Sequence, residues 1–255
     1  PPREIVFVVD TSGSMGGIAI AQARDSVSHA LQELRPEDRF HIIEFNSDYR
    51  ALYRSPMPAT DHHVQQAREF VRQLQANGGT EMLPALRAAL DPPTVSDTLR
   101  EALPLRQVIF ITDGAVGNEL ALFEEISARL AHSRLFTVGI GSAPNSWFMR
   151  EAARFGRGSH THIGALEEVG EKMAALFAQL SQPAAVNLHA SWPMAVEAWP
   201  QRLPDLYLGE PLLVAVSFGA QAPQGEVTVS GDIGGANWRQ SLQLVSGEDP
   251  HSANR

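Results

Sequence analysis

Three side chains with oxygen atoms occupy alternate positions near the start of the sequence. They are the carboxylate of Asp10 and the hydroxyls of Ser12 and Ser14, and Gly13 lies between the two serines. Glycine allows a tight backbone turn there because it has no Cβ. The apolar run that ends at Asp10 has the pattern of a strand buried on both faces of a parallel sheet. Ligands of such sheets bind at the carboxyl edge, so the three oxygens are predicted to converge on one point there.

Two further oxygen donors come from later segments. Thr80 follows Gly78-Gly79 at a predicted helix start, and Asp113 closes a second apolar strand. The pattern Asp-x-Ser-x-Ser is weak alone, because average residue usage produces it in roughly one chain in 20 of this length. With the usual strand order of a doubly wound sheet, however, the three segments meet at neighbouring carboxyl edges. The candidate site therefore consists of Asp10, Ser12, Ser14, Thr80 and Asp113.

An all-oxygen donor set suits a hard divalent cation, with Mg²⁺ expected first and Mn²⁺ or Ca²⁺ as alternatives. Three of the five donors are neutral hydroxyls, so two carboxylates leave little surplus negative charge around the ion. Octahedral coordination by five protein ligands would leave one position open. We expect that position to favour an anion from a partner, typically the carboxylate of an Asp or Glu.

These residues also have simpler interpretations. Asp10 and Ser12 could cap the first helix, because Asp and Ser are preferred N-cap residues, and Thr80 could cap its own helix. Asp113 followed by glycine is, by itself, more typical of a turn than of a metal ligand. The convergence of all three segments on one edge favours the metal site.

Enzymatic patterns fit less well, and we predict no enzymatic activity. A phosphotransferase of the haloacid dehalogenase kind needs a second Asp where Ser12 stands, and the Gly-x-Ser-x-Gly of a serine hydrolase fails at the same residue. The sequence has no Gly-Lys-Ser/Thr loop for nucleotide phosphates. His160 and His162 alternate on a predicted strand without a third metal ligand, so they are interpreted as surface or packing residues.

Strands and helices alternate over residues 1–182, which predicts one α/β domain with a doubly wound, mostly parallel sheet and helices on both faces. The predicted strands cover residues 4–10, 39–45, 49–53, 107–112, 135–140 and 160–163. The predicted helices cover residues 18–34, 61–74, 80–90, 119–131, 147–155 and 166–180. The strands at 4–10 and 107–112, together with the start of the helix at 80–90, position the candidate site.

The pattern changes at Pro183. Residues 183–247 contain strand-like runs at 186–191, 211–218, 226–230 and 238–244 without a helix, which predicts a small all-β, sandwich-like region. It is near the lower size limit for independent folding. Three tryptophans in it, Trp192, Trp199 and Trp238, are interpreted as core residues, with a sugar-binding role as the alternative. Residues 248–255 are expected to be a disordered tail.

Composition restricts the partners. The 255 residues carry a formal charge of −9, and the basic residues are scattered, which opposes binding to nucleic acid. Without cysteine the chain has neither disulfides nor thiolate metal ligands. No apolar run approaches the roughly 18 residues that span a bilayer, and no secretion signal opens the chain. Because Pro1-Pro2 lead straight into a strand, we expect a piece of a longer protein whose targeting segments lie elsewhere.

The Asp10–Ser14 motif, Thr80 and Asp113, in this order on alternating strands and helices, resemble the metal-ion-dependent adhesion site of von Willebrand factor type A domains, with all five positions intact. Residues 34–46, LRPEDRFHIIEFN, and residues 204–211, PDLYLGEP, are similar to the heavy chains of inter-alpha-trypsin inhibitor and their bacterial relatives. Among the latter, the chain most resembles marine proteobacterial sortase-target proteins.

The resemblance implies that Ser12, Ser14 and, depending on state, Thr80 touch the metal directly, while Asp10 and Asp113 act through water. It also implies that further strands of the β region precede residue 1. The expected function is metal-dependent protein binding or adhesion through a partner's acidic group, outside the cell or on its surface. The alternative is an intracellular A domain that uses the same site to dock on an ATPase, as in chelatase-type complexes.

Overall fold

The computed structural model describes residues 3–91, 105–114, 118–131, 133–141, 144–182, 184–201, 203–207, 209–219 and 224–244. The chain divides into two compact units, Pro1–Leu180 and Ser181–Arg255. The first unit contains every residue of the candidate site. Within the described residues, no helix combines the length and the apolar character needed to cross a membrane.

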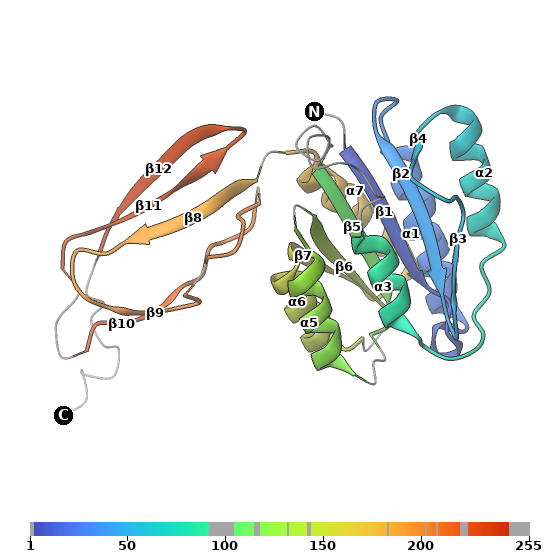
Figure 1. Cartoon of the computed structure of the whole chain (residues 1–255), viewed down its shortest axis with the longest axis horizontal. Helices are drawn as coiled ribbons and strands as arrows, with labels where there is room; N and C mark the ends of the chain where they lie inside the picture. Colours follow the sequence, from blue (N-terminus) through green and yellow to red (C-terminus); the bar gives the residue numbers. More distant parts are fainter. Residues whose placement is uncertain are drawn as a thin grey trace. The chain divides into compact units, whose positions relative to one another are not determined.

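The first unit is built on a seven-stranded sheet (Figure 1). Its strands are β1 (Arg3–Asp10), β2 (Arg39–Phe45), β3 (Tyr49–Ala51), β4 (Met57–Pro58), β5 (Leu105–Thr112), β6 (Arg134–Ile140) and β7 (Arg157–Ile163). The strand order is β3-β2-β1-β5-β6-β7, and β4 also pairs with β2. Strands β3 and β4 run antiparallel to β2, and the remaining pairs are parallel. The chain moves from β1 to β2 on one side and later to β5 on the other, so the strand order reverses at β1.

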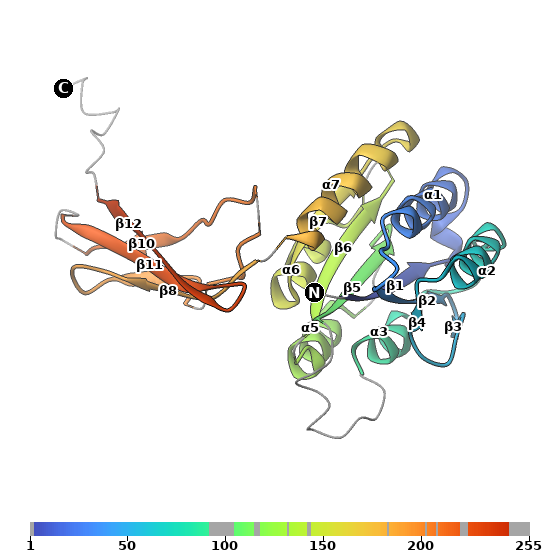
Figure 2. The ribbon, with the colours of Figure 1, turned by 90° about the horizontal axis from the view of Figure 1, so that it is seen from above.

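Helices cover both faces of this sheet (Figure 2). Helices α1 (Ile18–Gln32), α2 (Asp61–Arg72) and α7 (Val169–Ser181) lie on one face. Helices α3 (Met82–Leu90), α5 (Glu119–Arg129) and α6 (Ser146–Phe155) lie on the other. Two short 3-10 turns, η1 (Gly13–Met15) and η2 (Leu166–Glu168), precede α1 and α7. The predicted fold class is confirmed.

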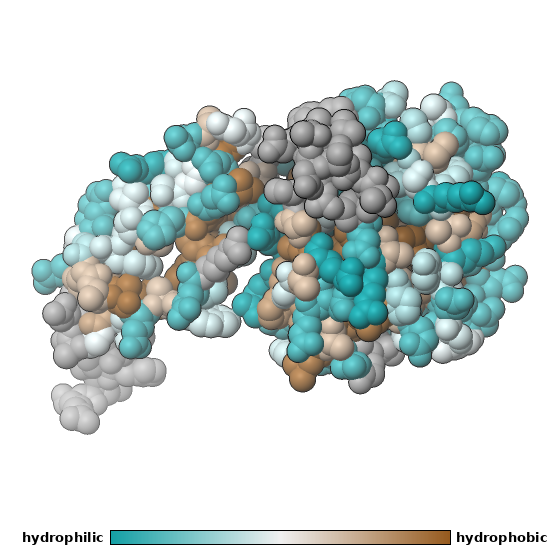
Figure 3. Space-filling view, viewed as in Figure 1, coloured by the Kyte–Doolittle hydropathy of each residue, from teal (hydrophilic) through white to brown (hydrophobic). Residues whose placement is uncertain are grey.

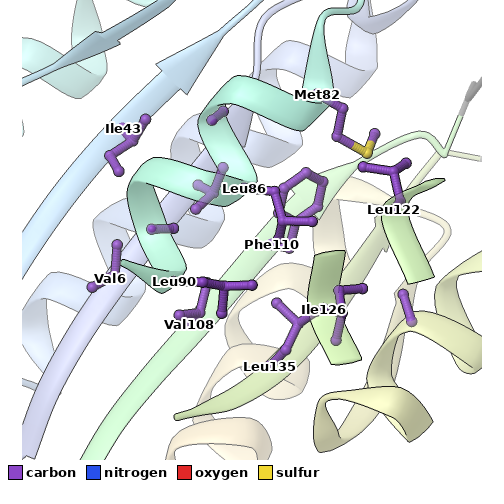
Figure 4. Packing of buried hydrophobic residues seen from close by; sticks show 14 of the residues in the cluster. Val6, Ile43, Met82, Leu86, Leu90, Val108, Phe110, Leu122, Ile126 and Leu135 are labelled. Carbon is purple, nitrogen blue, oxygen red and sulfur yellow. The ribbon is translucent and has the colours of Figure 1, made fainter. Parts of the chain in front are cut away.

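Strand β1 is apolar on both faces because both of its faces are covered. Phe7 points to α7, where its ring stacks on Phe177 with the centroids 6.4 Å apart. Val6 and Val8, its neighbours in sequence, belong to the opposite core cluster with side chains from α3, α5 and α6 (Figure 4). Side chains of a strand alternate between faces, so a central strand needs an unbroken apolar run.

Two ion pairs are buried near the amino ends of the strands. Arg3 Nη2 lies 2.6 Å from Asp38 Oδ2, and Arg106 Nη2 lies 2.6 Å from Glu4 Oε1. Burial alone would raise the pKa of Asp38, but hydrogen bonds from Arg3 and from the backbone amide of Arg35, with the charge of Arg3, hold that pKa below its ordinary value. Buried carboxylates at this end of the sheet therefore have arginine partners.

The second unit contains two small antiparallel sheets. One is β8 (Ala185–Ser191), β11 (Glu226–Ile233) and β12 (Ala236–Gln243), and the other is β9 (Glu197–Trp199) with β10 (Ala215–Ser217). The strand predicted at 211–218 is shorter in the structure, where β10 covers only Ala215–Ser217. The sequence does not predict β9, because the few residues of this strand show no clear alternation of polar and apolar side chains. Trp199 is exposed, so its interpretation as a core residue is wrong. The tail 248–255 lies outside the described residues.

Helix α3 begins two residues later than the sequence pattern suggests. The predicted helix starts at Thr80, whereas α3 starts at Met82, the first residue of that segment whose side chain enters the core. Thr80 and Glu81 therefore belong to the loop before the helix. This placement leaves Thr80 outside the hydrogen-bonded helix, in the loop whose Gly78 carbonyl accepts the N–H of Gly13.

Protonation of the buried His41 is predicted to destabilise the fold. Burial and the nearby charge of Arg106 lower the pKa of His41 to about 4, from an ordinary value of 6.5. The unfolded chain then binds more protons than the folded chain between these two values, so stability falls as pH decreases through that window. Between pH 6.5 and 5 the contribution is about 1–2 kcal/mol. Urea unfolding of the wild type and of His41→Phe at several pH values measures it, and parallel stability curves would contradict the prediction.

The α/β unit is also predicted to fold without the β region, because helical periodicity and the compact unit end at nearly the same residue. A truncated chain of residues 1–182 should be soluble, should unfold cooperatively in thermal denaturation, and should bind Mg²⁺ with the affinity of the full chain. If the truncated chain is unfolded, the two regions depend on each other for stability and the proposed boundary is wrong.

Candidate metal centre

Asp10 is the last residue of the central strand β1, and its side chain is fully buried. Both carboxylate oxygens have donors. The backbone N–H of Ser12 donates to Oδ1 over 2.8 Å, and the hydroxyl of Thr112 at the end of β5 donates to Oδ2 over 2.5 Å. Because the donors come from the next turn and from the neighbouring strand, the carboxylate is fixed between the ends of β1 and β5.

The two serine hydroxyls lie beside each other. Ser12 Oγ and Ser14 Oγ are 3.0 Å apart, with Ser12 buried and Ser14 exposed. The 3-10 turn that follows Ser12 gives this spacing, and the completely buried side chain of Met15 anchors the turn in the core. Adjacent ligands of an octahedral Mg²⁺, each about 2.1 Å from the ion, are about 3 Å apart. The spacing of the two hydroxyl oxygens fits such a pair.

The loop before α3 is hydrogen-bonded to the Asp10–Ser14 loop. Gly13 N–H donates to the carbonyl of Gly78 over 3.1 Å, and Asn77 N–H donates to the carbonyl of Thr11 over 2.8 Å. Gly78 has a φ of +74°, and a Cβ there would lie 2.8 Å from the Ser47 hydroxyl, so glycine is needed for both conformation and space. Thr80 follows two residues later and is half-buried.

Asp113 follows β5 directly and is also half-buried. Its carbonyl accepts a hydrogen bond from the backbone N–H of Asn145 over 3.2 Å. The next residue, Gly114, has a φ of +76° and lies so close to Asn145 that a Cβ would come within 3.0 Å of it. The loop after β5 is thereby held against the start of α6.

The electrostatics around Asp10 favour a positive charge. Burial raises the pKa of Asp10 above its ordinary value, although hydrogen bonds from Ser12 and Thr112 lower it, and the charge of Asp113 raises it further. The two carboxylates are thus close enough to repel each other, and the hydrogen bonds do not fully offset the loss of solvent around Asp10. A divalent cation between them would stabilise both ionised forms.

The structure brings all three predicted segments to one edge of the sheet, at the point where the strand order reverses. Crevices for ligands form at such switch points, because the loops after the two strands leave in opposite directions. The donor chemistry of Asp10, Ser12 and Ser14 fits Mg²⁺, and so does the 3.0 Å spacing of the two serine hydroxyl oxygens. Thr80 and Asp113 lie in the adjoining loops, so the complete donor set remains a prediction.

Sequence reasoning missed three residues that shape the site. Thr112 donates to Asp10, and Ser47 Oγ accepts the backbone N–H of Gly79 over 2.8 Å. The carbonyl of Asn46 accepts the N–H of Glu81 over 2.6 Å. Asn46 and Ser47 lie in the β2–β3 turn, which the sequence identifies only as a turn, so no pattern pointed to a supporting role.

The histidine pair on β7 has a different environment. The Nδ1 atom of His160 lies 3.0 Å from the Thr137 hydroxyl, and Nε2 of His162 lies 3.0 Å from the carbonyl of Gly141. Burial lowers the pKa of His160 to about 4. Across the part of the chain that the structure describes, no three His, Cys, Asp or Glu side chains form a cluster that could hold a metal ion. A site built largely from hydroxyls has only two such residues.

A doubly wound α/β unit with oxygen donors gathered at the ends of β1 and β5 defines a class of ligand-binding domain. Comparison with known proteins identifies the family within this class. Residues 3–161 match the family described as von Willebrand factor type A domain, and the chain belongs to this family.

Relatives and solved structures agree with this assignment. Inter-alpha-trypsin inhibitor heavy chain H2 of Sus scrofa is 27% identical over 231 residues, covering 86% of this chain and 24% of the relative. A von Willebrand factor type A structure from Catenulispora acidiphila matches with a TM-score of 0.66 at 18% identity, over 95% of this chain and 65% of that one. The open conformation of the pilus adhesin SpaC from Lactobacillus rhamnosus GG matches with a TM-score of 0.56 at 14% identity, over 94% and 43%.

This chain spans about a quarter of the length of the curated relatives it matches. The resemblance to inter-alpha-trypsin inhibitor heavy chains that the sequence motifs suggest is therefore supported for this part of those proteins. The likeness to the solved structures establishes the fold.

Replacement of Asp113 by Asn is predicted to weaken Mg²⁺ binding at least about tenfold, because one of two full negative charges beside the cation is lost. Isothermal titration with MgCl₂ measures the affinity, and thermal unfolding in chelator verifies that the variant is folded. Asp25→Ala, which changes an exposed carboxylate on α1, is the matched control and should bind as the wild type does. Equal affinity of a folded Asp113→Asn protein would remove Asp113 from the site.

Proposed function

We propose that this chain is a non-enzymatic, metal-dependent protein-binding module that captures an acidic group of a partner through a divalent cation. The observation that carries the proposal is the pair of hydroxyl oxygens of Ser12 and Ser14, 3.0 Å apart beside the buried carboxylate of Asp10. Thr80 and Asp113, in the adjoining loops, complete the proposed donor set. Mg²⁺ is the proposed ion, with Mn²⁺ and Ca²⁺ as alternatives.

A bound divalent ion would supply a positive charge and an open coordination position to an incoming carboxylate. The residues around the ion determine how much of its positive charge remains to attract the partner's carboxylate. Asp10 and Asp113 provide two negative charges, whereas the hydroxyls of Ser12, Ser14 and Thr80 provide none. The ion is therefore not over-neutralised, and an anionic donor gains more from it than a neutral amide does.

The absence of a catalytic role is part of the proposal. Von Willebrand factor type A domains generally mediate protein–protein interaction or adhesion. The Ser12 and Ser14 hydroxyls contact each other, and the described hydrogen bonds of His160 and His162 go to β6 and the loop after it. The described hydrogen bonds therefore pair neither serine with a histidine that could act as its general base.

We place the module in a bacterial cell-surface protein of the sortase-target kind. The fold likeness to a pilus adhesin agrees with this placement. Its main support is that residues 34–46 and 204–211 resemble bacterial relatives of inter-alpha-trypsin inhibitor heavy chains. Docking on an ATPase inside the cell would use the same ion and the same carboxylate. The experiment below therefore tests the chemistry that both settings share.

Selection of short random peptides displayed on phage, in Mg²⁺ and in EDTA, tests the proposal. Peptides recovered only in Mg²⁺ are predicted to be enriched in Asp or Glu, because a carboxylate reaches the open position. Synthetic versions of the best peptides should lose at least about tenfold in affinity when the acid becomes its amide. Ser12→Ala/Ser14→Ala protein should recover none of them. Equal recovery in EDTA, or equal binding of acid and amide, would place recognition elsewhere on the surface.

A further inference from the structure

Large apolar side chains lie exposed at the carboxyl edge of the sheet, where the candidate site is. Ile18 is the first residue of α1, Leu120 the second of α5 and Trp147 the second of α6. Their exposed fractions are 69%, 75% and 55%. These three, here called the apolar rim, are the most exposed large apolar side chains in the described part of the α/β unit. The others there, each 40–45% exposed, are Tyr49, Leu105, Phe155 and Leu166.

Two members of the apolar rim are connected to the loop that carries Asp113. Asn145, the N-cap of α6, donates its backbone N–H to the carbonyl of Asp113. Its side-chain amide donates to Glu119 Oε1 over 2.8 Å, at the first residue of α5. The rings of Trp147 and Phe123 meet edge to face with centroids 6.0 Å apart. The first turns of α5 and α6 are therefore fixed next to Asp113.

Internal packing does not account for this exposure. The first turn of a helix usually carries polar or acidic side chains, which stabilise its unpaired N–H groups. Leu120 and Ile18 instead leave most of their surface to solvent, while other positions of the same helices fill the core. Figure 3 shows hydrophobic side chains at the end of the α/β unit where α5 begins in Figure 1. Exposed apolar groups beside a ligand crevice are typical of a contact surface.

Charge determines what kind of partner fits this surface. Glu119 lies beside Leu120, Glu81 and Asp48 are exposed on the neighbouring loops, and the whole chain carries a charge of −9. An anionic membrane would be repelled by this edge. A protein segment with a single carboxylate brings much less negative charge, that charge would face the ion, and an uncharged apolar residue beside it is not repelled.

We propose that the partner's binding segment carries a large aliphatic or aromatic side chain a few residues from its metal-binding carboxylate, and that this side chain packs on the apolar rim. The inference rests on the proposed function, because the carboxylate brings the segment to this edge. The metal then recognises the acid, and Leu120 and Trp147 select the residue beside it.

A phage-displayed peptide library with Glu fixed at the centre and random residues on both sides tests the inference. Peptides selected in Mg²⁺ should be enriched in Trp, Phe, Leu, Ile or Met at one or two positions relative to Glu. The best synthetic peptide should bind Leu120→Ser about tenfold more weakly, the effect expected for losing a central apolar contact. Leu120 has most of its surface exposed, so this variant should unfold at the temperature of the wild type.

Leu105→Ser is the matched control, because Leu105 is exposed at the amino end of β5, the opposite edge of the sheet. It should bind the peptide as the wild type does. Trp147→Ser is a second variant of the apolar rim, and it should also bind the peptide more weakly. Its thermal unfolding is measured as well, because the Trp147 ring also contacts Phe123. Selected peptides with no apolar preference, or peptides that bind wild type and Leu120→Ser equally, would overturn the inference.

The outcomes separate this inference from the proposed function. If the synthetic peptide binds equally well with Gln in place of its central Glu, or if the same peptides are selected in EDTA, the result counts against the metal-dependent capture itself. A preserved Mg²⁺-dependent need for Glu without an apolar preference counts against the apolar rim alone. Analytical ultracentrifugation tests whether a second copy of the chain covers the apolar rim instead. Dimers that form in Mg²⁺ and disappear in Leu120→Ser would assign the surface to a second copy and overturn the proposed partner.

Discussion

The structure around the candidate site holds one carboxyl group, that of Asp10, buried inside the protein. Removing a carboxylate from water costs several kcal/mol unless other groups compensate for the lost hydration. A backbone amide and the hydroxyl of Thr112 provide part of that compensation, yet the pKa of Asp10 remains raised. The remaining deficit is electrostatic, and a divalent cation of the kind proposed here would remove it.

Buried carboxylates have different partners at the two edges of the sheet. Near the amino ends of the strands, Asp38 and Glu4 have arginine partners at 2.6 Å, so their charges are neutralised within the protein. At the carboxyl edge, the hydrogen bonds of Asp10 come from uncharged groups. The fold can therefore pair a buried carboxylate with arginine, whereas among the described residues no arginine pairs with Asp10. This contrast supports a ligand-binding role for Asp10 over a purely structural one.

The sequence predicts the parts of this architecture that depend on short repeating patterns. Unbroken apolar runs locate β1, β5 and β6 within one or two residues, since a strand covered on both faces needs apolar side chains throughout. The motif Asp-x-Ser-x-Ser likewise places its oxygens correctly at the end of β1. Contacts between distant segments leave no such pattern. The bond from Thr112 to Asp10 joins residues 102 apart, and Ser47 supports the loop of Gly79 from a turn that looks ordinary in the sequence.

Under the proposed function, the metal and its surroundings have separate tasks. An ion held by hydroxyls and two carboxylates attracts any accessible carboxylate, so it contributes affinity with little selectivity. Selectivity has to come from fixed side chains near the ion. Asn145 connects the loop of Asp113 to the helix starts that carry such side chains. This residue caps α6 by accepting the N–H of Phe148, and it bonds both the carbonyl of Asp113 and the carboxylate of Glu119. Because Asn145 contacts the Asp113 loop and two helix starts, its hydrogen bonds hold Asp113 and the first turns of α5 and α6 in one fixed arrangement. The orientation of the apolar surface is therefore mechanically tied to the loop that carries a proposed metal ligand.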